Sequence, residues 1–294
     1  MRRTFAQRPG FRLLLLLAFA AAAIALMTAA LERRAAGRKL REAILAELQP
    51  VALTNCALER FGSANDGGYL MCANLMEPLD AAYSYGVGPN DDWGCDVSRR
   101  YRVPVHQYDC FDPARPACQG GTFIFRDECV GNRTGYRGSH RFDTLENQLA
   151  RNGDRGRRVI IKMDIEGAEW DSLLAAPDAL LRAIPQIAME MHGYDDPKIV
   201  TVLKQLKRNF YLVNLHFNNW SGTPKAAPLP AWAYQTLWVN KRIGTLDPET
   251  GVPAPMSLLN APDAPALAGL STASAKRDRL AKMIPPRRRA NALI

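Results

Sequence analysis

The segment VIIKMDIEGAEW, residues 159–170, places three carboxylates directly after an apolar run. Such a run is typical of a buried strand, and an unpaired carboxylate buried at its end costs several kcal/mol. Side chains two apart on a strand share one side, so Asp164 and Glu166 are expected to face the same crevice. They would act there as general bases or cation ligands, or only cap backbone groups. Glu169 falls in the first turn of the following helix, where the helix dipole favours an acid, and we interpret it as structural.

Two later apolar segments also end in groups that could do chemistry. Glu190 and His192 lie two residues apart at the end of one segment, and His216, Asn218 and Asn219 follow the other. Histidines and carboxylates around one crevice can form a general acid/base set or a divalent-metal site. Each group could equally cap a neighbouring backbone amide, because residue type alone does not establish a functional role.

A glycine-containing turn supplies a second kind of signal. Gly86 and Gly88 follow an apolar segment, and Asp109 ends the next one, 21 residues after Gly88. This spacing matches the acid that accepts hydrogen bonds from ribose hydroxyls in Rossmann-type sites, although Asp109 could also be a cap or an ion-pair partner. The turn lacks the GxGxxG pattern, and Asp91 and Asp92 would repel a pyrophosphate. We therefore expect a nucleoside-type cofactor without phosphates rather than a dinucleotide.

These groups can meet only if the segments before them form one parallel sheet. In open α/β sheets, ligands bind beyond the carboxyl ends of the strands, where the strand order reverses. Apolar segments alternate here with helix-like ones, which predicts a Rossmann-like, doubly wound, mostly parallel seven-stranded sheet with helices on both faces. The last two strands have no helix between them and are expected to form an antiparallel hairpin at one edge. The expected strands are 81–88, 103–113, 121–131, 158–167, 185–192, 211–219 and 232–240, and the expected helices 89–101, 142–153, 168–183 and 196–209.

Charge excludes one class of partner for the folded domain. The net charge of the whole chain is +9, but residues 1–41 carry +8 and residues 276–294 carry +6. The remaining residues therefore carry −5. A mildly acidic body is a poor match for a phosphate backbone, so no nucleic-acid partner is expected.

Residues 13–31 form a run of 19 residues without a charge. That length is enough for a helix to cross a bilayer and exceeds most signal-peptide apolar regions. We predict a single-pass membrane anchor, with a cleaved signal or a buried helix as the alternatives. Basic residues flank both ends almost equally, so the side of the membrane stays undetermined.

The six cysteines fall in one window of the chain, from Cys56 to Cys129. An even, clustered set beyond a membrane segment favours disulfides, with 15 possible pairings, although reduced thiols remain the alternative. The predicted organisation is a basic tail (1–12), a transmembrane anchor (13–31), a helical stem (32–50), the α/β domain (51–243) and a Pro/Ala-rich, disordered basic tail (244–294).

Several segments resemble a known group of enzymes. The stretch IIKMDIEGAEW is similar to the KxDxEGxE stretch of FkbM-type and related S-adenosylmethionine-dependent class I methyltransferases. RFGSANDGGYLMC, YSYGVGPNDDWGCDVSRRY and HFNN resemble a methyltransferase-like subgroup found behind N-terminal membrane segments. The resemblance spans roughly residues 56–240. It departs from the usual pattern before the first glycine motif, where Ser84 and Tyr85 replace an acid.

The resemblance implies that Gly86 and Gly88 flank the methionine part of the cofactor. It implies further that Asp109 holds the ribose and that Asp164 lies near the sulfonium or the substrate. An acidic crevice lined by glycine suits a cationic sulfonium that carries no phosphate.

We therefore predict an S-adenosylmethionine-dependent methyltransferase that methylates an oxygen of a sugar or small-molecule hydroxyl. Its partners would be a small-molecule or glycan acceptor and, through the N-terminal helix, a membrane. The catalytic candidates are Asp164, His192 and Glu166, with Asp164 or His192 as the base, and the cofactor-binding candidates are Gly86, Gly88, Asp109 and Asp164. One alternative is a type II membrane glycosyltransferase that uses a nucleotide sugar and a divalent metal. The other is a catalytically inactive binding module of the methyltransferase fold.

Overall fold

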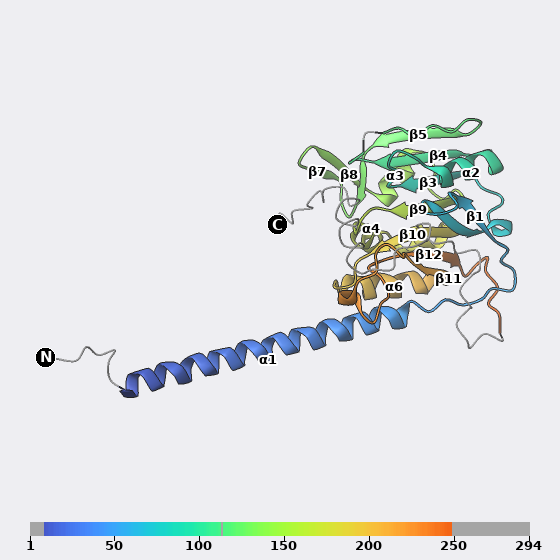
Figure 1. The fold of residues 1–294 in the computed structure, drawn as a ribbon. Coiled ribbons are helices and arrows are strands. Elements are labelled where there is room, and N and C mark those ends of the chain that lie inside the picture. Colours follow the sequence, from blue (N-terminus) through green and yellow to red (C-terminus); the bar gives the residue numbers. More distant parts are fainter. Residues whose placement is uncertain (1–8, 113, 249–294) are drawn as a thin grey trace, which may run out of the picture.

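A seven-stranded sheet runs through the centre of the protein, whose computed structural model describes residues 9–112 and 114–248 (Figure 1). Across the sheet the strand order is β11-β12-β10-β9-β3-β4-β5. The strands are β3 (Ala81–Tyr85), β4 (Pro104–Asp109), β5 (Thr122–Asp127), β9 (Val159–Asp164), β10 (Gln186–His192), β11 (Phe210–Phe217) and β12 (Ala233–Asn240). All seven strands expected from the sequence are present, and the mixed α/β class is confirmed.

The direction of the strands fixes the position of the crevice. The neighbours β10-β9, β9-β3, β3-β4 and β4-β5 are parallel, whereas β12 is antiparallel to both β10 and β11, as expected for the closing hairpin. Chain order reverses between β3 and β9, because β4 and β5 extend the sheet on one side and β10 extends it on the other. The carboxyl ends of β3 and β9 therefore meet at the switch point, where open α/β sheets bind ligands.

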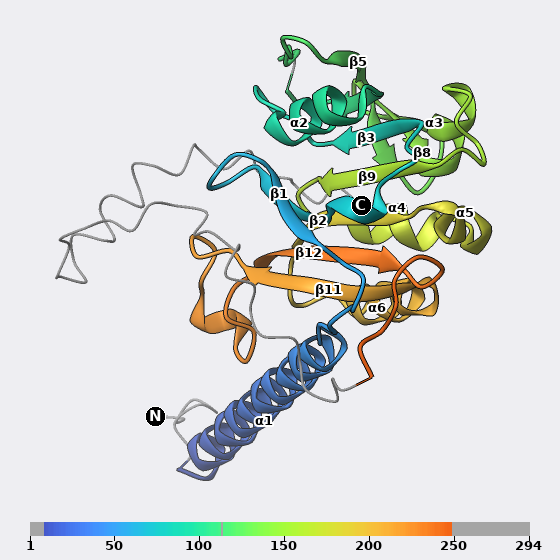
Figure 2. The same cartoon turned by 90° about the vertical axis from the view of Figure 1, so that its right-hand side faces the viewer.

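The two faces of the sheet are covered differently (Figure 2). Alternate side chains of each strand enter opposite cores: Tyr83 and Ile161 enter one, and Ala82 and Ile160 the other. Four helices cover the first face: α3 (Leu145–Arg151), α4 (Glu169–Ala175), α5 (Asp178–Ala183) and α6 (Lys198–Asn209). The second face is covered by α2 (Asp92–Tyr101) and by an antiparallel hairpin, β1 (Leu58–Gly62) and β2 (Gly68–Cys72). Helices were expected on both faces, and this hairpin covers part of the second one.

The predicted third strand, 121–131, is interrupted. It ends at Asp127, and residues Cys129–Gly131 form β6 of a separate three-stranded sheet with β7 (Gly135–Arg137) and β8 (His140–Thr144). The buried carboxylate of Glu128 lies at the break and pairs with Arg151 of α3 at 2.6 Å. Helix α3 consequently begins at Leu145, with Thr144 as its N-cap, rather than at residue 142. Two short 3₁₀ helices, Ala73–Leu75 and Pro224–Ala226, complete the described elements.

Helix α1 (Pro9–Glu47) extends away from the α/β body, and only its C-terminal end is docked (Figure 1). Ile44 at this end is buried in the helix-covered core. Glu47 pairs with Lys207 of α6 at 2.9 Å, and Arg41 pairs with Asp195 at 3.1 Å. The end of the predicted stem is therefore part of the domain.

The outer part of α1 contains the predicted anchor. The large apolar side chains described there are exposed, namely Leu16, Leu17, Phe19, Ile24, Leu26, Met27 and Leu31. Within residues 9–112 and 114–248, no helix combines the length and the hydropathy of a membrane span, so the transmembrane anchor predicted over 13–31 is unsupported.

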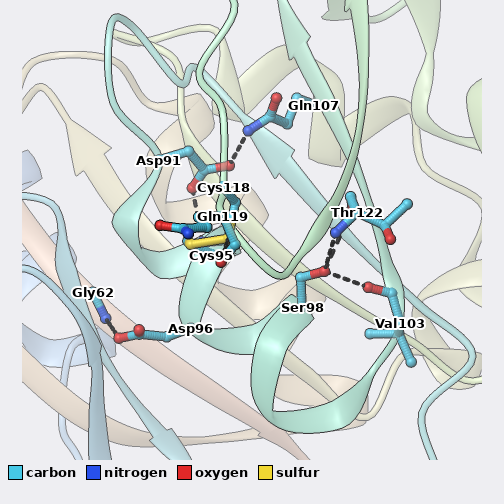
Figure 3. The surroundings of a disulfide bond; sticks show 11 residues. Gly62, Asp91, Cys95, Asp96, Ser98, Val103, Gln107, Cys118, Gln119 and Thr122 are labelled. Carbon is cyan, nitrogen blue, oxygen red and sulfur yellow. Dashed lines mark hydrogen bonds between the residues drawn. A yellow bond between two sulfur atoms is a disulfide. The ribbon is translucent and has the colours of Figure 1, made fainter.

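All six cysteines are paired, as Cys56–Cys72, Cys95–Cys118 and Cys110–Cys129. Figure 3 shows the second pair, which links α2 to the loop before β5. The Ser98 hydroxyl lies beside it, accepting a hydrogen bond from the Thr122 amide at 2.8 Å and donating one to the Val103 carbonyl at 2.7 Å. The disulfide and Ser98 thus fix one end of the edge strand β5 to the helix that follows β3.

The domain continues a little beyond its predicted end at residue 243. Leu246 forms a β-bridge with Leu53, and the Asp247 amide donates to the Ala52 carbonyl at 3.1 Å. The rest of the tail that was expected to be disordered, 249–294, lies outside the described residues.

Candidate functional site

The glycine turn lies where β3 and β9 meet. Gly86 has a φ of +71°, and a Cβ added there would overlap the carbonyl oxygen of Asp164. Its own carbonyl accepts a hydrogen bond from Lys162 Nζ at 2.6 Å. Gly88 has a φ of +55°, but a Cβ there would meet nothing within 4 Å. Gly86 is therefore required by close contact between two strand ends, whereas Gly88 borders open space.

Asp109 reaches this turn from the end of the neighbouring strand β4. One carboxylate oxygen accepts from the amides of Val87 and Gly88, each at 3.2 Å. The other accepts from the amides of Phe111 and Asp112, each at 2.9 Å. The predicted closeness of Asp109 to the glycine turn is confirmed, and the carboxylate joins two loops at the edge of the sheet. Because a carboxylate offers about four lone-pair sites, a ribose hydroxyl would share or replace one of these amides.

Asp164 ends β9 on the other side of the switch point. The Tyr69 hydroxyl, which belongs to the hairpin strand β2, donates to Asp164 Oδ2 at 3.1 Å. Lys162 Nζ lies 3.6 Å from the same oxygen. The Asp164 side chain is 24% exposed and reaches solvent. Burial raises the pKa of Tyr69, and the charge of Asp164 adds to that rise, so the hydroxyl stays a donor.

Glu166 does not continue the strand as expected. β9 ends at Asp164, and Glu166 adopts a φ of +54° in the turn that follows. Its side chain is 80% exposed, and its Oε2 nevertheless lies 3.9 Å from Nε2 of His192. Asp164 and Glu166 thus both lie near His192, but Glu166 is placed there by a turn and not by the alternation of side chains along a strand.

Glu169 contacts both the backbone amide and the ring of His192, and the sequence did not predict this contact. Glu169 is fully buried, and its Oε1 accepts from the backbone amide of His192 and lies 3.1 Å from its Nδ1. Its Oε2 accepts from the Gly167 amide at 2.8 Å. The Trp170 indole donates to the His192 carbonyl at 2.6 Å. Glu169 lies in the first turn of α4 and has a structural role, as expected, but its partner His192 was not foreseen; Glu169 and Trp170 together fix the histidine.

The electrostatics keep His192 charged at neutral pH. Burial opposes its protonation, but the hydrogen bond to Glu169 and the charges of Glu169, Asp164 and Glu166 outweigh burial and raise the pKa of His192 to about 9. An imidazole that is already protonated cannot accept a proton, so His192 as the resting base is disfavoured.

Glu190 lies two residues before His192 on β10 and is 5% exposed. The Asn218 side chain, at the end of β11, donates to Glu190 Oε1 at 2.9 Å. Burial and the nearby charge of Asp164 raise the pKa of Glu190 to about 7, although His192 and Asn218 act in the opposite direction. Glu190 therefore belongs to the same electrostatic cluster as Asp164 and His192.

Asp164, Glu190 and His192 each offer one ligand atom within 4.8 Å of the others. Two carboxylate oxygens and an imidazole nitrogen form a donor set that can hold a divalent cation or share a proton. Among the described residues, His216 is not part of this ligand set. Asp91 is also directed elsewhere: it caps α2 by accepting from Gly94 and accepts from the Gln107 side chain (Figure 3).

An aromatic side chain borders the cluster. The partly exposed Trp232 ring lies 5.8 Å from the His192 ring, measured between centroids. Its backbone carbonyl accepts from the Gly193 amide at 2.7 Å, and its amide donates to Ser221 at 3.1 Å. The loop between β11 and β12 thus forms a fixed wall of the site.

Comparison with protein-family models gives no match to this chain, and comparison with curated proteins gives no match either.

Proposed function

We propose that this protein is an S-adenosylmethionine-dependent methyltransferase that methylates a hydroxyl of a sugar or another small molecule. The observation that carries the proposal is the meeting of Gly86, Asp109 and Asp164 at the reversal point of the sheet. A nucleoside site in an open α/β sheet requires this position, and a cationic ligand requires this charge.

The residues fit such a cofactor on two counts. Gly88 leaves open space beside the carboxyl ends of β3 and β4, where a side chain would fill the cradle. The nearby strand ends carry the carboxylates of Asp109 and Asp164, and Lys162 Nζ lies 3.6 Å from Asp164. Gly86 and Gly88 would flank the methionine part, and Asp109 the ribose. When bound, S-adenosylmethionine supplies a methyl group activated by a positively charged sulfur.

The chain's own contribution is to orient the acceptor and to take its proton. Asp164 is the favoured base, because it is partly exposed and the Tyr69 hydroxyl holds only one of its two oxygens. His192, with a pKa of about 9, instead supplies a positive charge close to Asp164 and Glu166. Positioning of the acceptor contributes most of the acceleration in such a reaction, and base catalysis adds about 10²–10⁴-fold.

The test of the cofactor site compares substitutions at two glycines that have similar backbone conformations but lie at different places in the fold. Gly88→Ala adds a methyl group to the proposed cradle, and Gly153→Ala adds one at a turn far from it. Both residues have positive φ, +55° and +80°, and neither new Cβ would meet an atom within 4 Å. Calorimetric titration with S-adenosylhomocysteine should show binding to the wild type and to Gly153→Ala, and at least tenfold weaker binding to Gly88→Ala.

Two further results decide the proposal. Labelled S-adenosylmethionine with a panel of sugars and phenols should show methyl transfer by the wild type and a loss of at least about 10²-fold in Asp164→Asn. Wild-type protein that binds no adenosyl ligand at all would refute the proposal.

The carboxylate–histidine cluster favours a second candidate, a glycosyltransferase that binds a nucleotide sugar through a divalent metal. It predicts that a uridine or guanosine diphosphate sugar binds only when Mn²⁺ is present, and that adenosyl ligands do not bind. The same calorimetric experiment therefore separates the two functions.

A further inference from the structure

We propose that Asp164, Glu190 and His192 bind one divalent metal ion, through a carboxylate oxygen of each acid and Nε2 of the histidine. Mn²⁺ is the best-matched ion, because it accepts both carboxylate oxygen and imidazole nitrogen and leaves further positions for oxygen ligands. The existence of this site does not depend on the proposed methyltransferase activity. Only its use on an acceptor hydroxyl rests on that function.

The three side chains come from the ends of two adjacent parallel strands. Asp164 ends β9, and Glu190 and His192 lie at the end of β10, where Glu190 is the register partner of Asp164. Their ligand atoms lie within 4.8 Å of one another. Ion–ligand distances of about 2.1 Å place neighbouring ligand atoms about 3–4 Å apart, so rotation of side chains alone can close the set.

Each of the three side chains is oriented by a residue behind it. Glu169 lies 3.1 Å from His192 Nδ1, the Tyr69 hydroxyl donates to Asp164, and the Asn218 amide donates to Glu190. Residues that ligate metals are characteristically held in this way, with the second histidine nitrogen bonded to a carboxylate and the ligating carboxylates hydrogen-bonded in turn. A cluster of surface acids lacks such support, because each of its side chains is fixed only by solvent.

The free nitrogen of His192 points to the position of the ion. The side chain is 7% exposed, and within the described chain Nε2 has no hydrogen-bond partner; its nearest carboxylate oxygens belong to Asp164 at 3.8 Å and Glu166 at 3.9 Å. In metal-free protein a proton on Nε2 faces the two acids, and a metal ion that binds there displaces this proton. Either one places positive charge between the nitrogen and the acids, but only a metal ion bonds to all three groups.

A proton on Nε2 is the competing explanation, and Lys162 also offers a positive charge. Lys162, however, lies near the other oxygen of Asp164, Oδ2, at 3.6 Å, and its Nζ donates to the Gly86 carbonyl at 2.6 Å. The two explanations differ in a measurable way. If only a proton occupies Nε2, the protein should bind Mn²⁺ no more tightly than exposed acids do. The metal site instead predicts that tight Mn²⁺ binding requires both Glu190 and Glu169.

If the proposed function holds, the ion gives the acceptor hydroxyl a place to bind. A hydroxyl oxygen on a divalent ion loses its proton more readily than in water, because the ion stabilises the oxyanion. Asp164 is then a ligand, and the role of base passes from it to Glu166, whose side chain is 80% exposed and lies 3.9 Å from His192 Nε2. The substrates favoured by this arrangement carry two adjacent oxygens, such as the neighbouring hydroxyls of a sugar.

The test begins with the full chain after treatment with a chelator. Mn²⁺ is titrated against wild type and three variants, and free Mn²⁺ is followed by electron paramagnetic resonance. The wild type should bind one ion. Glu190→Gln should weaken binding at least tenfold by removing a ligand, and Glu169→Gln should weaken it about 10–100-fold by releasing the orientation of His192.

The matched control is Asp171→Asn, which removes a partly exposed carboxylate of the same helix α4 that pairs with Lys198 within the part of the chain that the structure describes. It should leave Mn²⁺ affinity unchanged. Pulsed electron paramagnetic resonance of the Mn²⁺-loaded wild type adds a test that needs no variant. One directly bound imidazole nitrogen should modulate the spin echo, and the modulation should be lost in His192→Gln.

Failure of the metal site and failure of the proposed function give different results. The metal proposal is overturned if wild type binds no Mn²⁺, if the nitrogen modulation is absent, or if all carboxylate variants bind as the control does. If the protein binds Mn²⁺ but no adenosyl ligand, the metal site is supported and the proposed methyltransferase function is refuted. Undiminished methyl transfer after complete chelation would overturn the role of the ion in the reaction.

Discussion

The buried carboxylate of Glu169 contacts His192 twice, at the backbone amide and at ring Nδ1. Glu169 begins α4, and His192 ends β10, so this pair joins a helix to the carboxyl edge of the sheet. The pair settles which histidine nitrogen faces the crevice. It also brings the carboxylates at the end of β9 into contact with the charge at the end of β10.

Removing the charge of Glu169 should lower the pKa of His192. In chelator-treated protein, nuclear magnetic resonance of labelled histidine should show His192 titrating near pH 9 in the wild type and clearly lower in Glu169→Gln. The physical reason is that burial alone disfavours the imidazolium, and Glu169 is the main group that offsets burial. Asp171→Asn should leave the titration in place. An unchanged pKa in Glu169→Gln would mean that Asp164 and Glu166 hold the proton.

The same pair predicts a pH-dependent stability difference. The folded pKa of His192 is raised above its ordinary value of 6.5, so the stabilisation is fully present below pH 6.5 and is lost as pH rises through about 9. Urea unfolding should therefore show the largest deficit of Glu169→Gln relative to wild type below pH 6.5. The deficit should shrink by about 2–4 kcal/mol by pH 9.5. A deficit that is constant across this range would contradict the assignment.

Gly86→Ala should be far more damaging than other substitutions at glycines with positive φ. Its Cβ would overlap the Asp164 carbonyl, so β3 and β9 would have to separate at the site. Gly153→Ala carries a similar backbone penalty, with a φ of +80°, but meets open space. Thermal and urea unfolding should show Gly86→Ala less stable than Gly153→Ala by at least about 2 kcal/mol. Equal losses in the two variants would contradict the close approach of the strands.

His106 should make the protein less stable in mild acid. Burial lowers its pKa below 6.5, although Asp154, at 3.2 Å, acts in the opposite direction. The unfolded chain then binds the proton more readily, so this contribution to stability is complete above pH 6.5 and falls as pH decreases from 6.5 towards the folded pKa, by at most about 1.4 kcal/mol per pH unit, and is constant below it. Urea midpoints of wild type and His106→Gln between pH 7.5 and 5 should show a shallower decline in the variant. Parallel curves would show that His106 does not control this transition.

The disulfides predict both a chemical and a thermodynamic result. Unreduced protein unfolded in denaturant should react with no thiol reagent, and reduction should release six thiols. Replacing Cys95 and Cys118 together by serine should lower the free energy of unfolding by about 2–4 kcal/mol, because the unfolded chain regains the freedom of the closed loop. Six reactive thiols in unreduced protein would contradict all three pairings.

Local patterns in the sequence were enough to find the strands. The mainly apolar composition of runs such as 159–163 predicted strands that are buried on both faces, and these residues are buried. The glycine turn and Asp109 were recognised from their spacing along adjacent elements. The same kind of reasoning misjudged Glu166, because the strand ends two residues earlier and a left-handed backbone conformation intervenes. The sequence pattern also predicted that the third strand continues past Glu128, because the ion pair of Glu128 with Arg151 cannot be recognised from nearby residues.

The sequence by itself determined the seven strands, their α/β class and the polar groups at the strand ends, since these depend on periodicity within a few residues. Only the tertiary structure decided the partners of those groups. Tyr69 reaches Asp164 across 95 positions of sequence, Glu169 meets His192 across 23, and one of 15 disulfide pairings is selected. Such contacts are set by the packing of elements against one another, so a chemical site appears only when the reversal of strand order brings the ends of β3, β9 and β10 together.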